Sequence, residues 1–111
     1  MPLFMTMIKL STASTKAIVE KPHDRAPLAK AGLEAVGCNL KEYYFALGPA
    51  DVVVIYEAPD ALTAASVSMA LGAAGTSSSV ETVQLFTSAE GMTAMTKASQ
   101  MHRNYQPPAG A

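Results

Sequence analysis

Apolar, aromatic and β-branched positions are concentrated in two neighbouring segments near the middle of the chain. Residues 39–47 and 51–57 are rich in Tyr, Phe, Val and Ile, and the break between them contains Gly48 and Pro49. Aromatic and β-branched residues favour strands, whereas Gly and Pro favour tight turns. The pattern therefore predicts a β-hairpin with Gly48 as a structural turn residue.

The register of this hairpin decides which side chains share a face of the sheet. We place Leu47 opposite Asp51, which also puts Lys41 opposite Glu57 and predicts an ion pair across the strands. One face then carries Tyr43, Phe45, Leu47, Val53 and Ile55. The other carries Glu42, Tyr44, Ala46, Val52, Val54 and Tyr56. Neither face has the regular polar positions of a solvated sheet, so we expect both to be covered.

Two further strands are expected, one near each end of the chain. Residues 3–10 are apolar at both odd and even positions, which indicates a strand buried on two faces. Residues 80–86 alternate Val80, Thr82, Gln84 and Phe86 against Glu81, Val83 and Leu85. This period of two predicts a fourth strand.

Helix-capping residues mark the two main helices. Asp24 precedes a helix over residues 25–36, which Gly37 ends, and Asp60 precedes a helix over residues 61–71. Asp is a favoured N-cap because its carboxylate accepts hydrogen bonds from the free backbone N–H groups of the first turn. We assign Asp60 this structural role alone.

Two shorter signals complete the pattern. Thr87 and Glu90 form a capping box that opens a third helix, which runs to residue 102. A helical turn is expected over residues 16–21, with Thr15 as its N-cap.

The order strand, helix, strand, strand, helix, strand, followed by a terminal helix, predicts an α+β protein. It is the ferredoxin-like βαββαβ arrangement, with a four-stranded antiparallel sheet and both main helices on one face. We expect one domain over residues 1–103 and a flexible tail over residues 104–111, which contains two prolines and a glycine. The open sheet face then needs a partner, and two such sheets packed together form a dimeric α/β barrel.

Composition narrows the class of protein. Of the 111 residues, 50% are hydrophobic and only 15% are charged, which favours a buried interface between identical subunits. The net charge is −1 and there is no Lys/Arg run, so no nucleic-acid partner is expected. No apolar run approaches the roughly 20 residues that span a bilayer, so no membrane partner is expected either. We interpret the N-terminus as mature chain without a signal peptide, and the single cysteine favours a cytoplasmic protein.

Several segments together resemble the GYD-domain family of small proteins, named for a Gly-Tyr-Asp signature before the third strand. The matching segments are Glu34-Ala35-Val36-Gly37, Leu40-Lys41-Glu42-Tyr43-Tyr44, Leu47-Gly48, Asp51-Val52-Val53-Val54 and Glu57-Ala58-Pro59-Asp60. The resemblance extends from about Met7 to Glu90, and it departs at Ala50, where the signature has its tyrosine. It implies a ferredoxin-like, dimeric α/β-barrel protein, and it implies no biochemical role.

The most promising candidate site is a cavity between two sheets. Glu42, Tyr44, Val54 and Tyr56 share one predicted face, where the aromatic rings and hydroxyls suit a small apolar or aromatic ligand. Glu42 is the weak candidate for a catalytic base there. The competing interpretation, which we favour, is that the two tyrosines pack a dimer interface.

Other polar residues have structural and functional interpretations side by side. Asp51 is either a buried base or, as we favour, an acceptor of hydrogen bonds from its own turn. His23 and Arg25 form a polar cluster suited to an anion, although helix starts are normally polar. Cys38 fits a small buried filler better than a nucleophile. The spacing of the two histidines and the cysteine supports no metal site, and no cofactor is expected.

Two functions of different class follow from these residues. The favoured one is a non-enzymatic homodimer, or a larger homo-oligomer, whose cavity between the sheets binds a small apolar molecule or whose surface serves assembly. The alternative is a cofactor-independent monooxygenase or isomerase that acts on an aromatic or enolisable substrate, by analogy with other dimeric α/β barrels. A third interpretation, a purely structural protein, predicts a cavity filled by the chain's own side chains.

Overall fold

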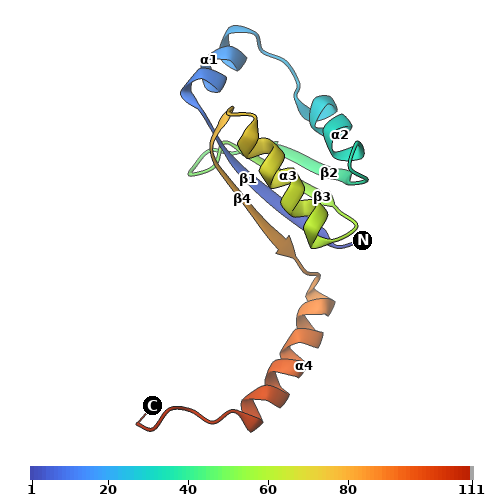
Figure 1. The fold of residues 1–111 in the computed structure, drawn as a ribbon, viewed down its shortest axis with the longest axis vertical. Coiled ribbons are helices and arrows are strands. Elements are labelled where there is room, and N and C mark those ends of the chain that lie inside the picture. Colours follow the sequence, from blue (N-terminus) through green and yellow to red (C-terminus); the bar gives the residue numbers. More distant parts are fainter. Residues whose placement is uncertain (111) are drawn as a thin grey trace.

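A computed structural model describes residues 1–110, and its elements follow the predicted order with one helix more (Figure 1). The strands are β1 (Leu3–Leu10), β2 (Asn39–Phe45), β3 (Val52–Glu57) and β4 (Ser77–Leu85). The helices are α1 (Thr12–Glu20), α2 (Ala26–Glu34), α3 (Ala61–Ala73) and α4 (Ser88–Asn104). The strands form an antiparallel sheet in the order β2-β3-β1-β4. This α+β topology is consistent with the predicted ferredoxin-like fold.

Two of the predicted caps have the expected geometry. An Asp60 carboxylate oxygen accepts a hydrogen bond from the backbone N–H of Thr63 at 2.8 Å, at the start of α3. At the start of α4, the Glu90 N–H donates to the Thr87 hydroxyl and the Thr87 N–H donates to the Glu90 carboxylate. The capping box is therefore confirmed, and local sequence alone sets both helix starts.

The start of α1 differs from the prediction. In place of a turn over residues 16–21 capped by Thr15, the chain forms a helix that begins at Thr12. The Ser11 hydroxyl caps it by accepting a hydrogen bond from the Ser14 N–H at 3.1 Å. The polar residues that follow β1 thus contain a helix cap, because Ser is as good an N-cap as Asp.

Helix α2 is shorter than predicted. Asp24 Oδ1 accepts a hydrogen bond from the Ala26 N–H at 2.9 Å, although the residue at the N-cap position is Arg25. The helix ends at Glu34, and Gly37 follows with a φ of +78°, which favours glycine. The predicted roles of Asp24 and Gly37 therefore hold, within a shorter span.

The predicted hairpin register is wrong by one residue over most of its length. Tyr43 lies opposite Val54 and Phe45 lies opposite Val52, whereas nearer the other end Leu40 lies opposite Tyr56. The register shifts between Leu40 and Glu42, which is the signature of a β-bulge. Next to the turn, the Ala46 N–H donates to the Asp51 carbonyl at 2.8 Å, so Ala46 and not Leu47 lies opposite Asp51. This difference of one residue places residues 42–45 on the opposite face of β3 from the one predicted.

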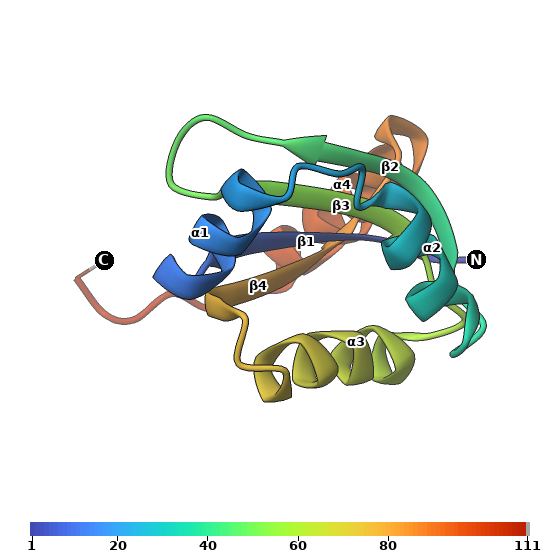
Figure 2. The same ribbon diagram turned by 90° about the horizontal axis from the view of Figure 1, so that it is seen from above.

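The two faces of the sheet are covered differently. Helices α2 and α3 lie on the same side, α2 against β2 and α3 against β4 (Figure 2). Under them the central strands present a buried core of Phe4, Thr6, Ile8, Val52, Val54 and Tyr56. The alternate residues of the same strands are only half-buried and form what we call the open face: Leu3, Met5, Met7, Val53 and Ile55.

Helix α4 projects from the end of β4 and gives the molecule its longest dimension of 59 Å (Figure 1). None of its residues, Ser88–Asn104, is buried, and Met92, Met95 and Met101 are each more than 60% exposed. Asn104, the first residue of the predicted tail, is the last residue of this helix. The domain bounds of 1–103 and the flexibility of residues 104–111 stay predictions.

Candidate functional site

A cleft of about 320 Å³ lies between α2 and α3, above the central strands of the sheet. We call it the α2–α3 cleft. Its floor contains Ile8, Val52 and Val54, and its walls contain Leu33 from α2 and Val67 from α3. Because α2 packs against β2 and α3 against β4, the two strands between them are left partly uncovered. The lining is mainly hydrocarbon, as in most small-molecule sites.

A chain of hydroxyl groups begins with two buried side chains in the floor of the cleft and continues to part-buried groups outside it. The Tyr56 hydroxyl is 3.0 Å from the Thr6 hydroxyl, which is 2.8 Å from that of Thr82. Thr82 in turn pairs with Ser68 of α3. Tyr56 is fully buried and stacks on Phe4, with ring centroids 6.1 Å apart. The network satisfies the buried polar groups of the floor and links β3, β1, β4 and α3.

Polar groups of α2 and β2 meet at one side of the cleft. Arg25 and Tyr43 both line it. Burial raises the pKa of the Tyr43 hydroxyl, and the nearby Arg25 guanidinium opposes that rise. Arg25 also lies 3.2 Å from the His23 ring nitrogen Nε2, and Nδ1 of the same ring lies 2.9 Å from the Lys21 carbonyl. The predicted pair of His23 and Arg25 therefore does come together, with Arg25 at the cleft.

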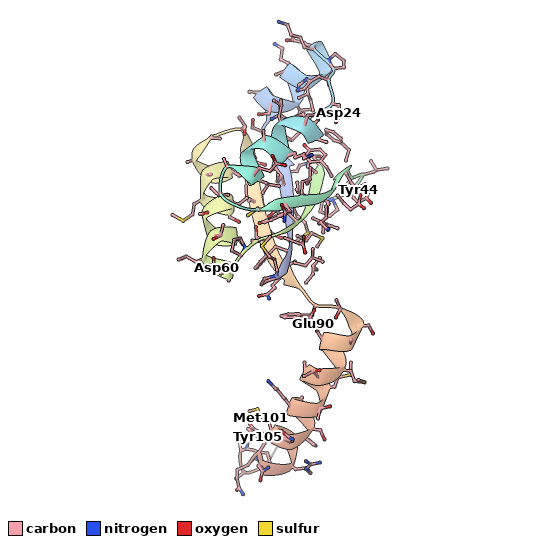
Figure 3. All side chains as sticks on the ribbon, turned by 90° about the vertical axis from the view of Figure 1, so that its right-hand side faces the viewer. Asp24, Tyr44, Asp60, Glu90, Met101 and Tyr105 are labelled. Carbon is pink, nitrogen blue, oxygen red and sulfur yellow. The ribbon has the colours of Figure 1, made fainter. Side chains whose placement is uncertain are left out.

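The four residues predicted to share a cavity lie on opposite faces of the sheet. Val54 and Tyr56 point into the α2–α3 cleft. Glu42 and Tyr44 lie on the open face, opposite Ile55 and Val53, and Figure 3 shows Tyr44 on the side of the sheet away from α3. The cause of the error is the turn, which was expected to place Leu47 opposite Asp51. Ala46 lies opposite Asp51 instead, which shifts the register of residues 42–45 by one.

Glu42 and Tyr44 interact with each other on that open face. The Glu42 carboxylate raises the pKa of the Tyr44 hydroxyl by accepting its hydrogen bond and through its negative charge. Tyr44 is 51% exposed and Glu42 is exposed as well. Glu42 also does not line the α2–α3 cleft, so it is not placed to act as a base on a molecule bound there. Nearby, the predicted ion pair of Lys41 with Glu57 is present, at 3.6 Å.

Asp51 has a structural role different from the predicted one. Its carboxylate accepts hydrogen bonds from the Leu10 N–H at 2.9 Å and from the Lys9 ammonium group at 3.2 Å, and so binds the end of β1 in place of its own turn. These donors lower the pKa of Asp51, the backbone N–H of Leu10 most strongly. A lowered pKa is the opposite of what the alternative role of general base requires.

The remaining candidates have structural surroundings. Gly48 has a φ of +149° in the turn, where other residues are strained. The hydrogen bonds from Thr63 lower the pKa of Asp60, in keeping with its role as a helix cap. Cys38 is 1% exposed, and burial raises its pKa, so the reactive thiolate is disfavoured.

Sequence reasoning missed most of the cleft. It did not select Thr6. The available signal was a threonine in the middle of an apolar strand, which indicates a buried hydroxyl with a hydrogen-bond partner. It also passed over Gly32, a small residue on the cleft side of α2 with no atom within 4 Å of where its Cβ would lie. Small residues facing a sheet leave space, but only the packing of α2 and α3 shows that nothing else fills it.

The described residues form neither a metal-ligand cluster nor a helix that could span a membrane. Within residues 1–110, no group of three or more His, Cys, Asp or Glu side chains is placed to hold a metal ion. Among the helices of the same residues, none combines the length and hydropathy that crossing a membrane requires.

Comparison with known proteins gives one match. The family model of the GYD domain matches residues 4–95, which is most of the 111-residue chain. Comparison with curated proteins gives no match, and comparison with solved structures gives none either. The match includes the sheet, the cleft and the first part of α4.

Proposed function

The chain belongs to the GYD domain family, and we propose that it is a homo-oligomeric module that binds a small apolar or aromatic molecule without transforming it. The observation that carries the proposal is the α2–α3 cleft, with its volume of about 320 Å³ and its hydrocarbon lining. The ligand site is thus proposed on the helix-covered face of the sheet and not between two sheets.

The chemistry of the lining supports binding. The described residues of the cleft supply hydrocarbon surface, hydroxyl groups and the Arg25 guanidinium. The two hydroxyls of the floor, from Thr6 and Tyr56, already hydrogen-bond to each other. Such groups hold a molecule through burial, hydrogen bonds and charge. An enzyme of the alternative class needs a titratable acid or base at the ligand, and the earlier candidate for it, Glu42, lies across the sheet.

The open face supports self-association. Met5, Met7, Val53 and Ile55 form an apolar surface along the two central strands. Water-exposed apolar surface of this kind is typical of interfaces. A second copy of the chain can cover this apolar surface by packing its own open face against it, sheet on sheet. We take that second copy to be the partner, because a two-fold axis brings the same apolar face of each copy together and buries both.

Native mass spectrometry of the full chain, purified from its host cells, tests both parts at once. We expect a dimer or a multiple of it, carrying a discrete small mass. A Gly32→Leu variant fills the cleft while improving helix propensity, because the space beyond Gly32 is open. It should keep the oligomer and lose the small mass.

The matched control is Gly72→Leu. Gly72 also lies in a helix with open space beyond its Cβ position, but it does not line the cleft. This variant should keep both oligomer and ligand. A ligand that persists in Gly32→Leu contradicts the cleft as the site, a ligand-free wild type contradicts binding, and a monomer contradicts self-association. Conversion of the bound molecule to another mass on incubation favours the enzymatic alternative.

A further inference from the structure

The α2–α3 cleft has a cation at its edge that no carboxylate of residues 1–110 neutralises. The ion pairs of these residues involve the four lysines Lys9, Lys16, Lys30 and Lys41, and none involves Arg25. The adjacent carboxylate, Asp24, is instead hydrogen-bonded to the Ala26 N–H. Arg25 lies 3.2 Å from the His23 ring and interacts with the Tyr43 hydroxyl, and neither of these groups carries a negative charge. Arg25 therefore retains N–H donors for another acceptor.

Hydrocarbon begins immediately beyond this cation. The cleft continues from Arg25 past the ring of Tyr43 to Val52 and Val54 on the floor and Leu33 on the wall. The last three are each less than 7% exposed. A guanidinium beside an apolar cavity matches a molecule with one anionic end and one apolar end. Neither the guanidinium alone nor the apolar cavity alone would select a molecule with both kinds of end.

The size of the cleft restricts the occupant further. A dry protein cavity of about 150 Å³ accommodates benzene, and this cleft has about twice that volume. It accommodates one or two rings or a short branched chain. An α-helix about 10 Å across does not fit, so the exposed methionines of α4 from a second copy are not the occupant.

The single positive charge of Arg25 restricts the kind of anionic group that the ligand can carry. A guanidinium binds a carboxylate through two parallel hydrogen bonds. One cation balances one negative charge, whereas a phosphate dianion would bring an excess charge to an apolar site, at a desolvation cost. Burial raises the pKa of the Tyr43 hydroxyl, so this group stays protonated beside Arg25 and can donate a further hydrogen bond.

We propose that the ligand of the α2–α3 cleft is a small monocarboxylic acid, whose apolar body lies against Val52, Val54 and Leu33 and whose carboxylate is bound by Arg25. The inference rests on the proposed function, because it takes the cleft to be the ligand site. It adds the chemical class of the ligand and the residue that selects it.

Calorimetric titration of the full chain with 2-naphthoic acid and 2-naphthamide tests the inference. The two probes share a ring system and differ in charge. Hydrogen bonds to charged groups contribute about 1.5–3 kcal/mol, so we expect the acid to bind at least about 10-fold more tightly than the amide. In Arg25→Gln this preference should disappear through weaker binding of the acid, with the amide unchanged. In Arg25→Lys part of it should remain, since the charge persists without the fork geometry.

The outcomes separate the inference from the function on which it rests. Equal affinity for acid and amide, both lost in Gly32→Leu, overturns the acid while the cleft remains the site. An acid preference that survives Arg25→Gln overturns Arg25 as its cause. Failure of both probes to bind the wild type overturns the inference, and native mass spectrometry then decides the fate of the proposed function independently. Circular dichroism of each variant confirms folding, which an exposed arginine should not control.

Discussion

The two faces of the sheet are made by alternate residues of the same strands, yet their chemistry is opposite to what their exposure suggests. The helix-covered face of β1 and β3 contains hydroxyls, Thr6 and Tyr56, and encloses a cleft. The open face is hydrocarbon along these two central strands, at Met5, Met7 and Ile55, and is only half-buried there, with Glu42 and Tyr44 beside it on β2. A sheet face that contacts only water is normally more polar than a buried face. The proposed ligand site on the covered face and the proposed interface on the open face both rest on this difference.

Neighbouring residues on β1 give the largest expected contrast. Phe4→Ala should destabilise the monomer by about 3–5 kcal/mol, because it empties a buried site and removes the ring stacked on Tyr56. Met5→Ala, one residue along on the open face, should cost the monomer much less. Chemical denaturation at low protein concentration measures both. Equal losses would contradict the assignment of the two faces.

A charge on the open face should disrupt self-association. Ile55→Asp should raise the dimer dissociation constant by at least about 100-fold, about 2.7 kcal/mol, because a carboxylate would be buried without a partner. Analytical ultracentrifugation measures the effect. Leu62→Asp on α3 is the control, since Leu62 is 81% exposed on the other side of the sheet and should not alter association. If Leu62→Asp dissociates the oligomer as well, the interface lies elsewhere.

The hydroxyl network of the covered face should lose more stability when its middle member Thr6 is replaced than when its end member Tyr56 is replaced. Thr6→Val preserves shape but leaves the Tyr56 hydroxyl buried without its partner, at a cost of about 1–3 kcal/mol. Tyr56→Phe leaves Thr6 bonded to Thr82 and should cost only about 0.5–1.5 kcal/mol. Thermal unfolding of both variants checks the order. A larger loss in Tyr56→Phe would show that the hydroxyl of Tyr56 has a further role in the cleft.

The smallest expected effect concerns Asp51, which binds the end of β1 at the edge of the sheet. Because its pKa is lower in the folded chain than the ordinary value of 3.8, the unfolded state binds the proton more readily. The stabilisation is therefore complete above the ordinary value and is lost as pH falls through the lower, folded one. Asp51→Asn should show a weaker decline of the melting temperature over that acidic window than the wild type. Identical pH profiles would show that Leu10 and Lys9 do not stabilise the charged form.

Local sequence predicted the parts of the fold that depend on a few adjacent residues. Asp60 and the Thr87–Glu90 box fix helix starts through hydrogen bonds within one turn, so they could be recognised without the rest of the chain. Ser11 was missed because another polar residue, Thr15, offered a competing cap. The alternation in β4 and the short run in β1 that is apolar at odd and even positions identified both strands, since neither pattern needs a partner to be visible.

The candidate site could not be predicted in the same way. Glu42 and Tyr44 were placed with Val54 and Tyr56 because Leu47 was assumed to lie opposite Asp51. Ala46 lies there instead, and this difference of one residue reverses the grouping. Strands that are apolar on both faces give no pattern from which the length of the turn between them could be corrected. Arg25 was identified as part of a polar cluster, but its position beside a cleft was not.

The sequence by itself determined the order and type of the main elements, the ferredoxin-like topology and membership of the GYD domain family, because periodicity, capping residues and turn residues act over a few positions. The tertiary structure decided the register of β2, the face on which each candidate residue lies, and the existence of a cleft between α2 and α3. These features depend on how helices 26–34 and 61–73 divide the sheet between them. That division is set by packing between residues far apart in the chain, and no local pattern encodes it.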